Sequence, residues 1–158
     1  MYVPSWGWAP LSGEGARRYG GRWNAVGTPA LYLAAELSTA WSEYNQGFVQ
    51  HPGLVIRLHM GGGLLADARE AQTRARFSIP DDLGGDHWRR DAETGAAPTQ
   101  VAAQRMIEAG VDGLRYPSRM SIGGMCVVLW RWNELGDPQL RIEDPENRLP
   151  RDAASWSS

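Results

Sequence analysis

The sequence predicts a single α+β domain, in which short strands form a split or packed β core that helices flank. Its 158 residues are close to the usual size of one domain, which is expected to span residues 1–158 with a flexible tail over about 150–158. Segments typical of strands and of helices do not alternate as they would in a parallel βαβ protein. No segment repeats at a fixed period, which excludes solenoids and propellers.

Short apolar segments bounded by turn residues predict the strands. The segment 125–132 is almost continuously apolar, so we place it at the centre of the sheet. The segment 54–59 alternates, with Leu54, Ile56 and Leu58 on one face, as in a half-buried strand. Further strands are expected at residues 30–34, 111–116 and 139–143.

Apolar side chains at helical spacing predict a helix directly after the first of these strands. Leu37, Ala40, Trp41 and Tyr44 form one stripe, and Ser38 can cap the start of the helix. Further helices are expected over residues 67–76 and 99–109, and loops over residues 8–28 and 79–97.

Charge and composition exclude several classes of function. All 16 basic residues are arginine, so the chain has no lysine for Schiff-base chemistry or for a P-loop. The net charge of −2 and the pI near 5.9 argue against a surface that follows nucleic-acid phosphates. No apolar run reaches about 18 residues and no signal peptide is visible, so a cytoplasmic protein without a membrane span is expected.

Metal and thiol chemistry are also disfavoured. His51, His59 and His87 lack the spacing of helical metal ligands, so no metal is expected. Cys126 is the only cysteine, and within its apolar segment it is expected to be a buried small hydrophobe.

Four polar residues remain as candidates for a site, namely Arg22, Tyr32, Glu43 and Ser118. Arg22 follows Gly21 in a tight loop, where glycine lets a ligand approach the backbone. Each candidate also has an ordinary structural explanation, such as a solvated helical glutamate or a core tyrosine. Residue types and spacing alone therefore leave the function open.

A family resemblance runs through these residues in order. It begins with Pro-Leu-Ser-Gly-Glu-Gly-Ala at 10–16 and Gly-Gly-Arg-Trp-Asn at 20–24, and it continues with Gly-Thr-Pro-Ala-Leu-Tyr-Leu-Ala at 27–34. The segments 112–118 and 127–132 complete the pattern. Over almost the whole chain, these motifs resemble the RES-domain family.

The resemblance implies an ADP-ribosyltransferase-like fold and a toxin of a bacterial type II toxin–antitoxin system. Members of the family pair with an Xre-type antitoxin, which is expected to cover the active-site cleft. They consume NAD+ as substrate by hydrolysis, by phosphorolysis or by transfer of ADP-ribose to a target protein. As the residues already indicate, no metal, no direct nucleic-acid partner and no membrane are expected.

Carried over by position, the catalytic residues of the family fall on Arg22, Tyr32, Glu43 and Ser118. Glu43 suits the stabilisation of an oxocarbenium-like transition state, and Arg22 offers a planar fork to pyrophosphate. Tyr32 is expected to stack on nicotinamide, and Ser118 to bond the ribose or the carboxamide. The other NAD+-binding residues expected nearby are Gly21, Trp23 and Asn24.

Two features depart from the family pattern. Many relatives carry an arginine in an N-terminal strand, whereas residues 1–9 contain none, and Arg17 and Arg18 are the nearest replacements in sequence. Relatives also tend to have asparagine at the position of Cys126. A different class of function stays open as the alternative, namely an RNA-binding or interaction module that uses tryptophan and arginine for stacking.

Overall fold

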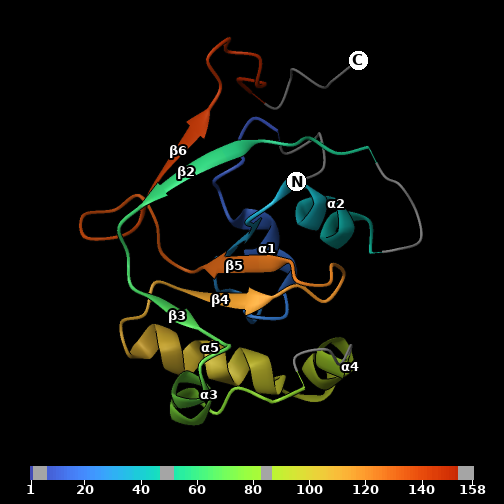
Figure 1. The fold of residues 1–158 in the computed structure, drawn as a ribbon, viewed down its shortest axis with the longest axis vertical. Helices are drawn as coiled ribbons and strands as arrows, with labels where there is room; N and C mark the ends of the chain where they lie inside the picture. The colour runs from blue at the N-terminus through green and yellow to red at the C-terminus, as the bar shows by residue number, and fades with distance from the viewer. Residues whose placement is uncertain (2–6, 47–51, 83–86, 153–158) are drawn as a thin grey trace.

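The computed structural model describes residues 1, 7–46, 52–82 and 87–152. Of the residues singled out above, His51 and the tail from residue 153 lie outside these ranges. Over the described residues the chain forms five helices and six strands (Figure 1). In chain order they are α1 (Glu14–Tyr19), β1 (Leu31–Ala34), α2 (Leu37–Asn45), β2 (Arg57–Gly61), β3 (Leu65–Asp67), α3 (Ala71–Phe77), α4 (His87–Thr94), α5 (Pro98–Glu108), β4 (Gly113–Pro117), β5 (Met125–Leu129) and β6 (Gln139–Glu143).

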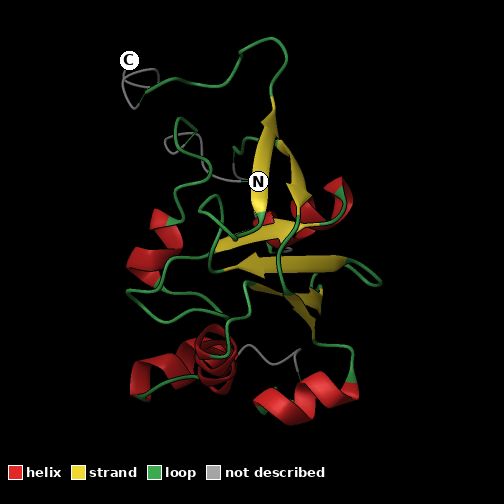
Figure 2. Cartoon of the chain, turned by 90° about the vertical axis from the view of Figure 1, so that its left-hand side faces the viewer, coloured by secondary structure: helices red, strands yellow, loops and turns green. Residues whose placement is uncertain are grey.

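Four strands form the main sheet in the order β1-β5-β4-β3, and β2 pairs with β6 in a separate two-stranded sheet. β5 lies between β1 and β4 and is antiparallel to both, which confirms the central position predicted from its apolar sequence. β3 runs parallel to β4 at the edge. Helices flank these two sheets, so the predicted α+β class is confirmed (Figure 2).

Two apolar clusters cover the two faces of the main sheet, because successive strand residues point to opposite sides. Val128 and Leu114 belong to the same buried cluster as Met106 of α5. Leu31 belongs to the other cluster, together with Leu140 of β6. Helices α3, α4 and α5 lie along the β3–β4 side of the sheet (Figure 1). The second sheet therefore covers one face, while α5 covers the face toward which Tyr32 points.

Two helices form where loops are expected, so those two expectations are wrong. α1 lies within residues 8–28 and α4 within residues 79–97. Neither helix contains a buried residue. An apolar stripe facing a core is the sequence signal for a surface helix, and these two segments do not have one.

Other expectations need new boundaries. The strand expected at 54–59 begins only at Arg57, and the helix expected at 67–76 begins only at Ala71. The first residue of that segment, Asp67, pairs with Arg115 as the last residue of β3. At the start of α2 the N-cap is Glu36, and Ser38 lies inside the helix, where its carbonyl accepts a hydrogen bond from the Ser42 hydroxyl.

Candidate active site

A cavity of about 920 Å³ lies where β1, α2 and the turn after α1 meet, a volume within the range of small-molecule and cofactor sites. Three of the residues singled out in the sequence, Arg22, Tyr32 and Glu43, line it. Arg89 of α4 and Arg119 of the loop after β4 line it as well. Three arginines in one cavity wall favour an anionic ligand.

Glu43 is held through one of its two carboxylate oxygens. The Ser118 hydroxyl donates a hydrogen bond to Oε1 at 2.6 Å, and the backbone N–H of Arg119 donates to the same atom at 3.1 Å. The Cys126 thiol lies 3.8 Å from Oε1 and is a third, weaker donor. These three contacts with described residues all end on Oε1, so Oε2 is the oxygen available to a ligand.

The loop after β4 orients Ser118 toward Glu43. The backbone N–H groups of Met120 and Ser121 donate to the Ser118 hydroxyl oxygen at 3.2 and 3.0 Å. With both lone pairs used, the hydroxyl gives its one proton to the carboxylate. The sequence predicts a contact between Ser118 and the substrate, but Ser118 is not among the described residues that line the cavity. The structure brings it to Glu43 instead.

Arg22 lies in a turn that a β-bridge between Gly21 and Asn24 closes. The Tyr32 hydroxyl accepts a hydrogen bond from the N–H of Trp23 at 2.9 Å and donates one to Asn24 Oδ1 at 2.8 Å. A Cβ on Gly21 would come within 2.5 Å of that hydroxyl, so glycine is required there. The backbone on both sides of Arg22 is therefore fixed.

Two residues far away in the sequence hold the same turn from behind. Gln100 of α5 donates from Nε2 to the carbonyl oxygens of Gly21 at 2.9 Å and Asn24 at 3.2 Å. Trp130 donates its indole N–H to the carbonyl of Trp23 at 2.8 Å. Sequence reasoning misses both residues. The contacts span 76 to 107 positions, so no local pattern indicates them.

Tyr32 binds the turn through its hydroxyl and lines the cavity with its ring. Burial of the hydroxyl raises its pKa well above the ordinary value, so it stays protonated and can donate to Asn24. The residue as a whole is nevertheless 37% exposed, and it lines the cavity. A partly exposed ring at the cavity wall is compatible with the predicted stacking on nicotinamide.

Trp23 and Asn24, which the sequence predicts as contacts for NAD+, do not line this cavity. Their exposed fractions are 0% and 1%. Trp23 packs on Tyr116 with ring centroids 5.5 Å apart, and Asn24 Nδ2 donates to the carbonyls of Ala16 and Thr28. Trp23 and Asn24 therefore support the turn that carries Arg22 instead of contacting a ligand directly.

The model of the RES domain family matches residues 3–152. The chain belongs to the RES-domain family. A chain in the crystal structure of the M. tuberculosis MbcT-MbcA toxin–antitoxin complex has the same fold, with a TM-score of 0.59 and 23% sequence identity. The match covers 83% of this RES domain and 74% of that chain. Among curated proteins, none matches the chain.

Cys126 of this RES domain lies on β5 beside Glu43, and it is buried, as the sequence predicts. Burial, followed by the charge of Glu43, raises the pKa of the thiol to about 12. The thiol therefore stays protonated near neutral pH and can donate toward the carboxylate. An asparagine amide at this position could also donate a proton.

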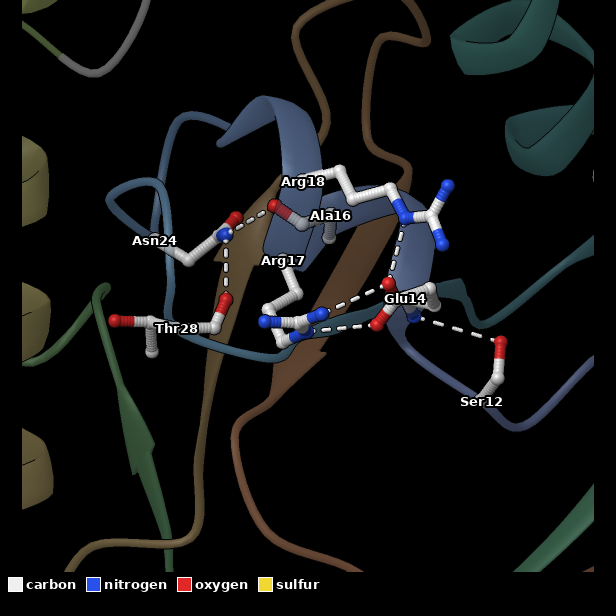
Figure 3. A network of polar contacts seen from close by, with 7 residues as sticks. All are labelled: Ser12, Glu14, Ala16, Arg17, Arg18, Asn24 and Thr28. Carbon is white, nitrogen blue, oxygen red and sulfur yellow. Dashed lines mark hydrogen bonds and ion pairs between the residues drawn. The ribbon is translucent and has the colours of Figure 1, made fainter.

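Arg17 and Arg18, the nearest replacements in sequence for an N-terminal arginine, contact Glu14 and not the cavity. Both hydrogen-bond to Glu14 on the surface of α1, at 2.7 and 2.6 Å (Figure 3). These bonds lower the pKa of Glu14 to about 2. Neither arginine is among the described residues that line the cavity. Apart from Arg22, the arginines that line it are Arg89 and Arg119.

The chemical groups that meet in the cavity are a carboxylate oriented by hydrogen bonds, several guanidinium groups and an aromatic ring. Among the described residues, no group of three or more histidine, cysteine, aspartate or glutamate side chains could hold a metal ion. Within the same residues, no helix is long and apolar enough to cross a membrane.

Proposed function

We propose that this RES domain is the toxin of a toxin–antitoxin system and that it cleaves the nicotinamide–ribose bond of NAD+. The observation that carries the proposal is the carboxylate of Glu43, which Ser118 orients through Oε1 at the wall of the 920 Å³ cavity. Membership of the RES family supports an enzyme that acts on NAD+. The toxin–antitoxin complex with the same fold supports the biological role.

The bond to be broken joins N1 of nicotinamide to C1′ of the ribose. The electron pair of this bond leaves with N1, so the departing nicotinamide is neutral and needs no general acid. Oε2 of Glu43 stabilises the positive charge that develops on C1′ and the ring oxygen. Water, phosphate or a protein side chain then adds to C1′ and releases one proton, which Glu43 can accept.

Arg22 binds the pyrophosphate of the substrate. Its planar guanidinium forms paired hydrogen bonds to phosphate oxygens, which a single ammonium group could not reproduce. The contacts at Gly21 and Asn24 hold the backbone beside Arg22, so the turn needs no rearrangement when the substrate binds. The ring of Tyr32 stacks on the nicotinamide.

An enzyme that consumes NAD+ needs an inhibitor in its own cytoplasm, and we infer an Xre-type antitoxin that covers this cavity. The arginines of the cavity wall favour a carboxylate-bearing segment as the blocking group. Saturating ADP-ribose should then slow the association of toxin and antitoxin. An association rate that ADP-ribose leaves unchanged would show that the antitoxin binds elsewhere.

The activity is tested by incubating the purified chain with NAD+, with and without phosphate and candidate acceptor proteins, and identifying the products by mass. The expected products are nicotinamide together with ADP-ribose, its phosphate ester or an ADP-ribosylated protein. Intact NAD+ under all conditions would refute the proposal. RNA binding that weakens steeply with salt would then favour the RNA-binding alternative.

A further inference from the structure

Trp88 is a large aromatic side chain of the cavity wall that neither apolar core accounts for. Helix α4 has no buried residue, and Trp88 belongs to neither of the two buried clusters of the fold. The residue is half-buried and lines the same cavity as Glu43 and Arg22. A tryptophan in a cavity wall offers a flat apolar surface to an aromatic ligand.

Arg89 and Gln46 accompany this ring. The guanidinium carbon of Arg89 lies 5.1 Å from the centroid of the Trp88 ring, within the range of a cation–π contact. Its Nη2 lies 3.5 Å from Oε1 of Gln46, the C-cap residue of α2. The side chains of α4 thus meet α2 within one helical turn of Glu43.

The residues assigned so far account for only part of a dinucleotide. Glu43 acts at the ribose that bears nicotinamide, and Arg22 acts at the pyrophosphate. The adenosine half still needs a partner, and Trp88, Arg89 and Gln46 border the same cavity. Purine bases stack on tryptophan and on guanidinium planes, and glutamine side chains pair with the hydrogen-bonding edge of adenine.

We propose that Trp88, Arg89 and Gln46 form the subsite for the adenosine half of NAD+, with the adenine base stacked on Trp88. This inference rests on the proposed function, because it names the part of the substrate that this wall of the cavity recognises. It makes α4 a determinant of dinucleotide specificity that is separate from the bond-breaking group.

The test compares two ligands that differ in the adenylate alone. Binding of NAD+ and of nicotinamide mononucleotide, which lacks adenylate, is measured by calorimetry with full-length protein carrying Glu43→Gln to prevent turnover. Adding Trp88→Ala should weaken NAD+ binding by roughly 5- to 150-fold, the range for loss of one base–aromatic stack. Binding of the mononucleotide should stay unchanged, and Trp88→Phe should retain most of the affinity for NAD+.

Trp41→Ala is the matched control, because Trp41 is a partly exposed tryptophan of α2 that does not line the cavity. It should alter neither affinity. An equal loss of affinity for both ligands in Trp88→Ala would show that Trp88 only maintains the shape of the cavity. Unchanged affinity for NAD+ would show that Trp88 does not touch the substrate. Either result overturns the inference alone. If the Glu43→Gln protein that retains Trp88 binds neither ligand, and the wild type leaves NAD+ intact, both this inference and the proposed function fail.

Discussion

The two walls of the cavity hold their functional side chains in different ways. On one wall, Ser118 and the backbone of Arg119 bind a carboxylate oxygen of Glu43 itself. On the other, Tyr32 and Gln100 bind the backbone on either side of Arg22. The difference matches the proposed tasks. A group that stabilises a transition state must be oriented at its reacting atom, whereas a phosphate-binding arginine needs a fixed point of attachment.

The largest effect should come from removing the charge of Glu43. Glu43→Gln keeps the size of the side chain and can still accept the Ser118 hydrogen bond, yet kcat for NAD+ should fall by at least about 100-fold. The melting temperature should stay unchanged. Glu36→Gln, at the exposed N-cap of the same helix, should retain full activity. Near-normal turnover by Glu43→Gln would break the proposed mechanism.

Ser118→Ala tests whether this wall acts by orienting the carboxylate. A hydrogen bond to a charged group contributes about 1.5–3 kcal/mol, so kcat should fall roughly 10- to 150-fold while KM stays nearly constant. Ser121→Ala is the control, because that side chain contacts Thr39 rather than Glu43. A rise in KM at constant kcat would instead favour the substrate contact that the sequence predicts for Ser118.

Gln100→Leu tests in the same way whether the other wall acts by holding the backbone beside Arg22. It removes the donor for the carbonyls of Gly21 and Asn24, so stability should fall by about 1–3 kcal/mol. Because the turn would lose its support, KM for NAD+ should rise roughly 10-fold, equivalent to about 1.4 kcal/mol, with kcat largely kept. Gln104→Leu, which removes an exposed amide bonded to Glu108, should change neither constant. A selective fall in kcat would contradict this assignment.

The smallest effect near neutral pH should be the contribution of Cys126 to the pH dependence of stability. The thiol has a pKa of about 12 in the folded chain against an ordinary value of 9.0. Well below pH 9 the thiol is protonated in both states and stability is unaffected. As pH rises from 9 toward 12 the unfolded thiol ionises first, so the free energy of unfolding falls.

Cys126→Ala should remove this part of the decline. Denaturant unfolding of both proteins between pH 8 and pH 11 measures it, and the difference between them cancels the tyrosines, which titrate in the same range. Rapid alkylation of the folded wild type at pH 8 would contradict a thiol that burial keeps protonated.

Several parts of this molecule follow from local sequence alone. The continuous apolar run at β5 predicts a central strand, since only a strand covered on both faces can be apolar throughout. The resemblance to the RES-domain family, rather than residue types and spacing, predicts a shared site for Arg22, Tyr32 and Glu43, and all three line one cavity. In each case the information lies within a few neighbouring residues or within a family pattern.

Tertiary structure alone determined what these residues touch. The Ser118–Glu43 bond spans 75 positions, and the Gln100–Gly21 bond spans 79. Trp88 reaches the cavity from a helix whose sequence has no apolar stripe. The physical reason is that periodicity and turn residues report the backbone conformation and burial of a single element. Hydrogen bonds between distant segments depend on how sheets, helices and turns pack, and no single segment encodes that arrangement.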